Sequence, residues 1–270
     1  MKFSEELNAV ISLVIKAGKE VLNLYNKDYD INIKEDNSLL TEADLLSNKI
    51  ITEGLEKFGY DIISEEKNFD KKDYTKKVWI IDPLDGTKDF IQKTGEFSIM
   101  VALLEDRKPI LGVVYVPVLD KLYIAEKDKG AFLFYNNSYK MLNINQSKEV
   151  EDFKMVVSRN HFLEELRKIS LELNIKNFNK MGSVGVKFCS IAEGKSDLAL
   201  YTNSKMGIWD CASSHIILEE AGGEVLDIYG NNPEYNFDTK KMKNGFVGIG
   251  TKDKKVVEKV VKAINKVLGL

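Results

Sequence analysis

Apolar residues recur at steps of three and four along the first part of the chain, which is the spacing of one face of an amphipathic helix. The first such run begins after Ser4, a favoured N-cap residue. It consists of Leu7, Val10, Ile11, Val14, Ala17, Val21 and Leu24. A second run follows Thr41, which together with Asp44 has the spacing of a capping box in which Asp replaces the usual Glu. We therefore predict two amphipathic helices at the start of the chain.

The pattern then changes to short apolar runs separated by charged or Gly-containing turns, which predicts β-strands. These strands are expected at Asp61–Ser64, Val78–Asp82, Phe97–Leu104, Ile110–Pro117, Leu122–Ala125 and Ala131–Phe134. Beyond about Lys148, strand and helix patterns alternate. Strands are expected at Met155–Ser158, Leu198–Tyr201, Glu224–Ile228 and Phe246–Ile249, and helices at Phe162–Leu173, Gly185–Glu193, Asp210–Ala221 and Lys254–Val267.

Two helices on a largely antiparallel sheet, followed by an alternating half, predict a layered α/β architecture. We divide the chain into an N-terminal α+β domain, residues 1–150, and a C-terminal α/β domain, residues 151–270. The boundary is drawn from the pattern alone, because the sequence has no Pro-rich linker, repeat or low-complexity segment.

Composition and charge exclude several classes of protein. The 270 residues are 44% hydrophobic and 30% charged, which is enough to build a core and excludes intrinsic disorder. The net charge of −3 gives no electrostatic reason to expect a nucleic-acid polymer as partner. Cys189 and Cys211 are too few for a disulfide framework, and their spacing is not a zinc pattern. No apolar run approaches the ~18 residues of a membrane span, so we expect a cytoplasmic protein, either a monomer or a homodimer.

The predicted strand Val78–Asp82 ends in a carboxylate, and a second carboxylate, Asp85, follows three residues later. Asp82 follows the apolar residues, and Pro83 and Gly86 then halt the strand and allow the backbone to turn sharply. Asp82 and Asp85 can therefore converge, with the Leu84 carbonyl between them. Hard divalent cations bind such oxygens, although Asp-Pro and Asp-Gly also occur in ordinary surface turns.

Two further apolar runs end in acidic residues. Ile62-Ile63-Ser64 precede Glu65 and Glu66, and Ile208-Trp209 precede Asp210. Each alone fits an ordinary strand end or a helix N-cap. Together with the first strand they predict a shared acidic site, and the helix N-terminus beside Asp210 favours phosphate.

These motifs, in their order and spacing, resemble those of the inositol monophosphatase superfamily, which comprises magnesium-dependent, lithium-sensitive phosphatases. The motifs are Glu65-Glu66, DPLDGT from Asp82 to Thr87, and Trp209-Asp210 leading to Glu220-Ala221-Gly222-Gly223. Within the superfamily the chain looks like the 3'(2'),5'-bisphosphate nucleotidases. This second likeness is carried by Leu84–Ile91, Gly95–Phe97, Pro109–Tyr115, Val157–His161 and Lys187–Cys189. The resemblance implies a five-layered αβαβα sandwich.

The resemblance also implies roles for individual residues. Two or three Mg²⁺ ions would be bound by Glu65, Asp82, the Leu84 carbonyl, Asp85 and Asp210. Asp44 and Thr87 would orient and deprotonate the attacking water, and Glu65 would share in catalysis. Substrate contacts are implied for Gly86, Thr87, Lys88, His161, Ser183, Lys187 and Asp210.

Two of these substrate residues have specific expected contacts. His161 would lie near a nucleotide, and Lys187 would meet the second phosphate of the substrate. From the residues alone, Asp44 could equally be a plain first-turn helix acid, His161 an exposed loop residue and Lys187 a solvated helix residue. The turn Gly182–Gly185 looks more like that of the inositol phosphatases.

The small phosphorylated substrate expected from the resemblance is adenosine 3',5'-bisphosphate, from which the 3'-phosphate is removed to leave AMP. The alternative is an inositol-1-monophosphatase or a related sugar-phosphate phosphatase. A third hypothesis is a non-catalytic sensor of a phosphorylated ligand. We expect His215, Cys189 and Cys211 to be structural residues.

Overall fold

In the computed structural model, the described part of the chain comprises residues 2–27, 31–33, 39–66, 76–144, 148–159, 163–202 and 206–270, without the side chains of 31–33 and 39. Its α-helices are α1 (Glu5–Tyr25), α2 (Glu42–Leu55), α3 (Thr87–Ile91), α4 (Glu164–Glu172), α5 (Val184–Ala192), α6 (Ile208–Glu220) and α7 (Lys254–Leu268). Its strands are β1 (Ile31–Ile33), β2 (Leu39–Thr41), β3 (Asp61–Ser64), β4 (Lys77–Asp85), β5 (Ser98–Glu105), β6 (Lys108–Val116), β7 (Lys121–Glu126), β8 (Ala131–Tyr135), β9 (Ser138–Leu142), β10 (Lys154–Ser158), β11 (Asn177–Met181), β12 (Leu198–Tyr201), β13 (Glu224–Leu226) and β14 (Phe246–Ile249). Short 3-10 turns occur at η1 (Glu56–Phe58), η2 (Pro117–Leu119) and η3 (Val150–Asp152).

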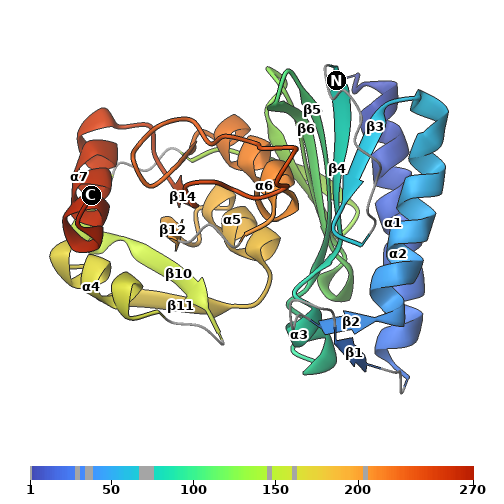
Figure 1. The fold of residues 1–270 in the computed structure, drawn as a ribbon, viewed down its shortest axis with the longest axis horizontal. Coiled ribbons are helices and arrows are strands. Elements are labelled where there is room, and N and C mark those ends of the chain that lie inside the picture. The colour runs from blue at the N-terminus through green and yellow to red at the C-terminus, as the bar shows by residue number, and fades with distance from the viewer. Residues whose placement is uncertain are drawn as a thin grey trace.

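The elements stack in five layers (Figure 1). Helices α1 and α2 cover one face of a seven-stranded sheet, and α5 and α6 lie between that sheet and a five-stranded sheet. Helices α4 and α7 cover the far face of the second sheet. The predicted αβαβα sandwich is therefore confirmed.

The two sheets differ in strand direction. The first has the order β3-β4-β5-β6-β7-β8-β9, in which β3 and β4 are parallel and the other neighbours antiparallel. The second has the order β11-β10-β12-β14-β13, in which β10 is parallel to β11 and β12, and β14 is antiparallel to β12 and β13. Strands β1 and β2 form a separate antiparallel pair.

Strand β4 is apolar on both faces because helices cover both faces of its sheet. Trp79 and Ile81 pack in the cluster that includes α1 and α2, whereas Val78 and Ile80 pack toward α5 and α6. A strand buried on both sides reads as a continuous apolar run rather than an alternating one. This is why the run that precedes Asp82 was readable from the sequence.

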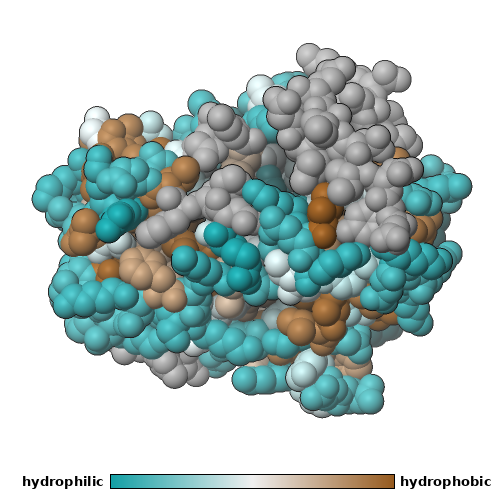
Figure 2. Space-filling model, turned by 90° about the horizontal axis from the view of Figure 1, so that it is seen from below, coloured by the Kyte–Doolittle hydropathy of each residue, from teal (hydrophilic) through white to brown (hydrophobic). Residues whose placement is uncertain are grey.

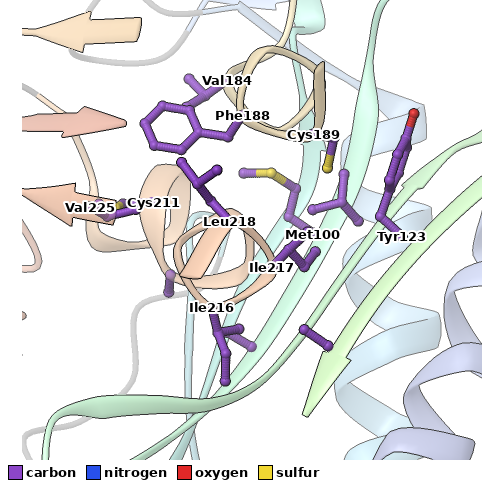
Figure 3. Close-up of a cluster of buried hydrophobic side chains, with 14 of the residues drawn as sticks. Met100, Tyr123, Val184, Phe188, Cys189, Cys211, Ile216, Ile217, Leu218 and Val225 are labelled. Atoms are coloured by element: carbon purple, nitrogen blue, oxygen red, sulfur yellow. The ribbon is translucent and has the colours of Figure 1, made fainter. Parts of the chain in front are cut away.

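The inner helices join the two sheets through one apolar cluster (Figure 3). Phe188 and Cys189 of α5 and Ile217 of α6 belong to the same buried cluster as Met100 of the first sheet and Val225 of the second. The two halves of the chain therefore share one continuous core.

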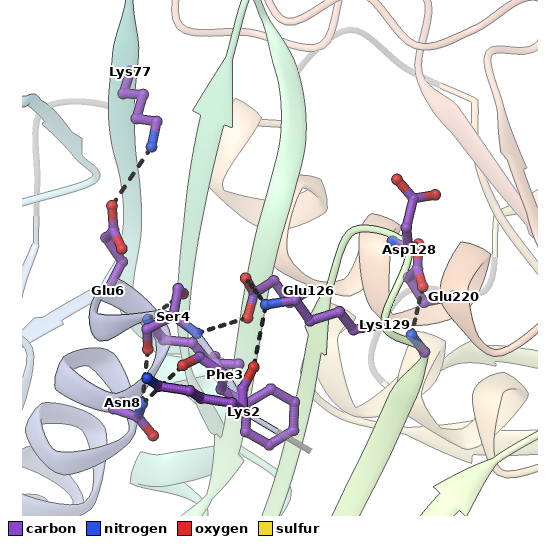
Figure 4. A network of polar contacts seen from close by, with 12 residues as sticks. Lys2, Phe3, Ser4, Glu6, Asn8, Lys77, Glu126, Asp128, Lys129 and Glu220 are labelled. Carbon is purple, nitrogen blue, oxygen red and sulfur yellow. Dashed lines mark hydrogen bonds and ion pairs between the residues drawn. The ribbon is translucent and has the colours of Figure 1, made fainter.

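Polar contacts tie the start of α1 to the first sheet, and the end of α6 to the neighbouring hairpin (Figure 4). The Ser4 N–H donates to Glu126 Oε2 over 3.1 Å, and Lys129 Nζ lies 2.6 Å from the other oxygen of Glu126. The Gly130 N–H donates to Glu220 Oε2 over 2.7 Å. These contacts hold the start of α1 against β7, and the end of α6 against the turn between β7 and β8.

Most predicted elements are confirmed, with boundaries shifted by a few residues. The pattern did not predict the β1–β2 pair, β9, β11 or α3. The strands of the first sheet lie within residues 61–142 and those of the second within residues 154–249. The predicted boundary at residue 150 falls between them, and the division into two domains stays a prediction. None of the helices in the described ranges combines the length and apolar character needed to cross a bilayer.

Candidate active site

The end of β4 carries the first two acidic residues of the site. Asp82 is opposite Met100 of β5 and Asp85 is opposite Ser98, so β4 has one residue more than β5 between these pairs. Side chains three residues apart in a regular strand point to opposite faces. The extra residue of a bulge brings the Asp82 and Asp85 carboxylates to the same side. Pro83, which has no N–H to donate to the ladder, lies inside this bulge.

Asp210 reaches the same site from α6. The helix begins at Ile208 with Gly207 as its N-cap, so Asp210 is its third residue. The expected start of this helix at Asp210 is therefore wrong by two residues. The Gly207 N–H donates to Asp210 Oδ2 over 2.5 Å and holds the carboxylate at the helix start. One carboxylate oxygen each of Asp82, Asp85 and Asp210 lies within 4.8 Å of the other two.

Glu65 follows β3, the parallel neighbour of β4. Its N–H donates to the Ile81 carbonyl over 3.1 Å, which extends the pairing of the two strands. Burial raises the pKa of Asp82 well above its usual range, and the charges of Glu65, Asp85 and Asp210 raise it further. Glu65 is thus an electrostatic neighbour of the three aspartates. Among the described residues, Glu65 is not part of the group of carboxylates whose oxygens lie within 4.8 Å of one another.

The three aspartates form a cluster of like charge, in which Asp82 and Asp85 are buried and Asp210 is half-buried. Burial also raises the pKa of Asp210, and the charges of Asp85 and Glu65 add to this effect. Carboxylates repel one another strongly at such separations in a low-dielectric site. A hard divalent cation removes that repulsion and accepts carboxylate oxygens as ligands. The donor set therefore fits a magnesium-type ion.

Helix α5 begins against Asp85. The Ser183 hydroxyl and the Gly185 N–H both donate to Asp85 Oδ2, the latter over 2.8 Å. Lys187 is only 4% exposed, and its Nζ donates to the carbonyls of Gly182 and Ser183. Burial lowers the pKa of Lys187 to about 8, although the charge of Asp85 and other nearby acids opposes this effect. Lys187 is therefore a buried lysine of the site and not a solvated helix residue.

Thr87 and Asp44 are hydrogen-bonded to each other. Thr87 Oγ1 lies 3.2 Å from Asp44 Oδ1 and 3.3 Å from the Leu84 carbonyl oxygen. Asp44 Oδ2 accepts the Thr41 N–H over 2.8 Å and the Thr41 hydroxyl over 2.5 Å. Gly86, with a φ of +94°, makes the turn that leads from β4 to Thr87. Asp44 thus stabilises the start of α2 and contacts Thr87 with its other oxygen.

The other predicted substrate residues differ in their exposure to solvent. Lys88 is exposed on α3, which lies on the lower side of the molecule in Figure 1. Figure 2 shows this side, where hydrophilic residues predominate and hydrophobic ones form separate groups. Ser183 is buried, and its hydroxyl lies 2.7 Å from that of Ser98. His161 lies outside the described residues.

The three residues expected to be structural, His215, Cys189 and Cys211, are all buried. His215 Nδ1 lies 2.8 Å from the Tyr235 hydroxyl, and its Nε2 lies 3.1 Å from Glu219 Oε1. Cys189 and Cys211 are buried and free. Their burial is what packing residues would show, and the structural interpretation stays a prediction.

Hydrogen bonds and ion pairs of Glu96 and Arg159 connect the two halves of the chain near the start of α5. Arg159 Nη2 lies 2.6 Å from Glu96 Oε2, and Arg159 Nε lies 3.7 Å from Asp89 Oδ1. Glu96 accepts the Gly182 N–H over 2.7 Å on its carboxylate and the Ser183 N–H over 3.1 Å on its backbone carbonyl. Glu96 therefore holds the backbone of Gly182 and Ser183 in the position from which the Ser183 hydroxyl donates to Asp85.

Sequence reasoning assigned no role to Glu96 or Arg159. Both lie in segments that supported the resemblance, but isolated charges in separate segments carry no periodic signal. Only their separate positions in the motif stretches could have drawn attention to them.

A model of the inositol monophosphatase family matches residues 3–267 of the chain. The chain belongs to the inositol monophosphatase family. The 3'(2'),5'-bisphosphate nucleotidase CysQ of Buchnera aphidicola is 36% identical over 246 residues, which cover 87% of this chain and 89% of that protein. The CysQ of Escherichia coli strain K12 is 33% identical over 247 residues, covering 89% and 98%.

Solved structures of the family have the same fold. An IMPase of Thermotoga maritima superposes with a TM-score of 0.82 at 26% identity, covering 98% of this chain and 99% of that one. CysQ of Bacteroides thetaiotaomicron superposes with a TM-score of 0.78 at 28% identity, covering 93% and 99%. The resemblance drawn from the motifs is confirmed. The protein is a phosphatase of this metal-dependent family.

Proposed function

We propose that this phosphatase removes the 3'-phosphate of adenosine 3',5'-bisphosphate with the help of Mg²⁺, releasing AMP and inorganic phosphate. The relatives named as 3'(2'),5'-bisphosphate nucleotidases support this substrate class, at 31–36% identity over 85–90% of the chain.

The observation that carries the proposal is the buried Lys187 beside the acidic cluster. An ammonium group has three donors, and the carbonyls of Gly182 and Ser183 take two of them. The third is available to an anion. A substrate with a single phosphate, bound to the cation at the acidic cluster, has no second anionic group for the Lys187 ammonium to bind. A bisphosphate has one.

We assign the cation site to Asp82, Asp85, Asp210, Glu65 and the Leu84 carbonyl. Bound there, Mg²⁺ supplies Lewis-acid stabilisation of the phosphoryl oxygens and lowers the pKa of water. Ser183 and Gly185 fix one oxygen of Asp85 through their hydrogen bonds, which leaves its other oxygen for a ligand.

The Thr87–Asp44 pair handles the proton of the attacking water. As the water oxygen attacks phosphorus, Thr87 Oγ1 accepts a proton and passes its own to Asp44 Oδ1, to which it is already hydrogen-bonded. The P–O bond to the 3'-oxygen breaks, and this oxygen leaves as an alkoxide that takes a proton from solvent to give the 3'-alcohol of AMP. The two Thr41 donors keep the Asp44 side chain in place.

A substrate panel tests the proposal. We expect kcat/KM for adenosine 3',5'-bisphosphate to exceed that for 3'-AMP and for inositol 1-phosphate by at least about tenfold, about 1.4 kcal/mol of transition-state stabilisation. Removal of Mg²⁺ with EDTA should abolish turnover, and adding Mg²⁺ back should restore it.

The second candidate activity is hydrolysis of inositol monophosphate or a related sugar phosphate. It is favoured by the fold similarity to the Thermotoga maritima IMPase and by the turn Gly182–Gly185. Faster turnover of inositol 1-phosphate than of the bisphosphate would establish it. Tight binding of the bisphosphate without turnover of any monoester would instead support a sensor.

A further inference from the structure

Tyr201, the last residue of β12, carries a buried hydroxyl that has no hydrogen-bond partner among the described residues. Burying a hydroxyl without a partner costs free energy, and nearly all buried side-chain polar atoms in proteins are paired. The Tyr201 residue as a whole is only half-buried, although its hydroxyl oxygen is shielded from solvent. The unpaired oxygen therefore indicates a donor position that a ligand completes.

Aromatic packing fixes the position of this hydroxyl. The Tyr201 ring stacks on Phe246 with centroids 4.8 Å apart and on Phe188 with centroids 6.3 Å apart. Because the C–O bond lies on the axis of the ring, a ring flip does not move the oxygen. The hydroxyl therefore cannot turn away to find another partner.

The surroundings of Tyr201 belong to the candidate active site. Lys187 Nζ lies 5.8 Å from the centre of the Tyr201 ring. Burial raises the pKa of the Tyr201 phenol well above its usual range, and the charges of Asp85 and Asp210 raise it further. The phenol thus stays protonated and acts as a donor close to a second donor, the Lys187 ammonium. Two donors at one place suit an anionic oxygen.

We propose that Tyr201 is a specificity-determining residue whose hydroxyl donates a hydrogen bond to the phosphate that is not hydrolysed, next to Lys187. This inference rests on the proposed function, since it requires a substrate with two phosphates. It adds to that function a neutral donor that distinguishes a bisphosphate from a monoester.

The substitution Y201F tests it, because only the hydroxyl is lost. We expect KM for adenosine 3',5'-bisphosphate to rise about tenfold with kcat changed less than twofold, the effect of one lost hydrogen bond to a charged group. Hydrolysis of 3'-AMP, which differs only by lacking the 5'-phosphate, should be unchanged. Titration calorimetry should show AMP binding weakened by a similar factor. Without ligand the variant should melt at the same or a higher temperature, because an unpaired buried hydroxyl is gone.

Y123F is the matched control. Tyr123 is also a buried residue, but its hydroxyl donates to Glu193 Oε1 over 2.7 Å. Its loss should lower the melting temperature and leave the ratio of kcat/KM for the two substrates unchanged.

Three results would overturn the role of Tyr201. They are an unchanged ratio of kcat/KM for the two substrates in Y201F, a loss that appears in kcat rather than in KM, and AMP binding as tight as in the wild type. Failure of the proposed function is distinguishable, because it appears in the wild-type enzyme itself as equal turnover of the bisphosphate and 3'-AMP.

Discussion

The burial of Lys187 predicts an unusual dependence of stability on pH. The pKa of its ammonium is about 8 in the folded protein and 10.5 in the unfolded chain. Below pH 8 both states hold the proton, and the folded state carries a charge that burial disfavours. Between pH 8 and 10.5 the unfolded state binds more protons, so the free energy of unfolding rises with pH in this window.

The size of the effect follows from the two pKa values. Their difference, at about 1.4 kcal/mol per pH unit, corresponds to about 3 kcal/mol that the buried charge costs at neutral pH. Most of this, roughly 2.5 kcal/mol, is regained between pH 7 and pH 10. K187M has no group to titrate at this position, so its stability should lack this rise.

The assay is urea unfolding of the metal-free protein between pH 7 and pH 10. With a slope of about 2–3 kcal/mol per molar urea, the wild-type midpoint should rise by roughly 1 M relative to that of K187M. Lys262, exposed on α7, provides the control K262M, which removes one positive charge at the surface. Its midpoint should follow the wild type at every pH.

Parallel curves for the wild type and K187M would refute the reasoning. They would mean that Lys187 keeps its proton in both states over this range, and therefore that the nearby acids offset the cost of burying its ammonium. Other groups that titrate in this window are common to both proteins and cancel in the difference.

Four further substitutions test the assignments of the site residues. D85N should leave less than a tenth of kcat and weaken Mg²⁺ binding in calorimetry, because an amide lacks the charge that a divalent ion needs; unchanged affinity would remove Asp85 from the cation site. D44N and T87A should each lower kcat by about 10²–10⁴, and the double variant should lose little more, because both residues serve one proton; additive losses in the rate assay would contradict this. E96A should raise the Mg²⁺ concentration for half-maximal rate by about tenfold, with kcat at saturating Mg²⁺ nearly unchanged. The reason is that Glu96 acts on Asp85 only through Ser183. A loss of kcat that added Mg²⁺ does not restore would argue against this positioning role.

The acidic cluster could be predicted because its acids follow apolar residues, and the run before Asp82 is long because both faces of β4 are buried. The bulge between Asp82 and Asp85 could be anticipated only as a turn, since Pro83 and Gly86 signal a break without its geometry. The start of α6 was misplaced because Asp is a common N-cap, while Gly207 gives no side-chain signal. Here the backbone N–H of the cap residue binds Asp210 instead.

Exposed and short elements were the ones that the pattern could not reveal. Residues 138–141 of β9 are all exposed, and β11 has no buried residue, so neither strand shows alternation between apolar and polar positions. Lys187 was open to two interpretations because lysine is usually solvated. Its burial follows from the carbonyls of Gly182 and Ser183, which only the folded turn brings together.

The site also depends on both halves of the chain. Asp85 comes from the first sheet, but the hydrogen bonds that fix it come from Ser183 and Gly185 at the start of α5. Asp210 comes from α6, whose apolar side packs in the cluster that spans both sheets. Bringing these like charges together is unfavourable, and it is the burial of that shared apolar cluster that stabilises the arrangement. A cation that binds the cluster should therefore stabilise the folded chain as a whole, because its ligands come from elements that pack in this one apolar cluster.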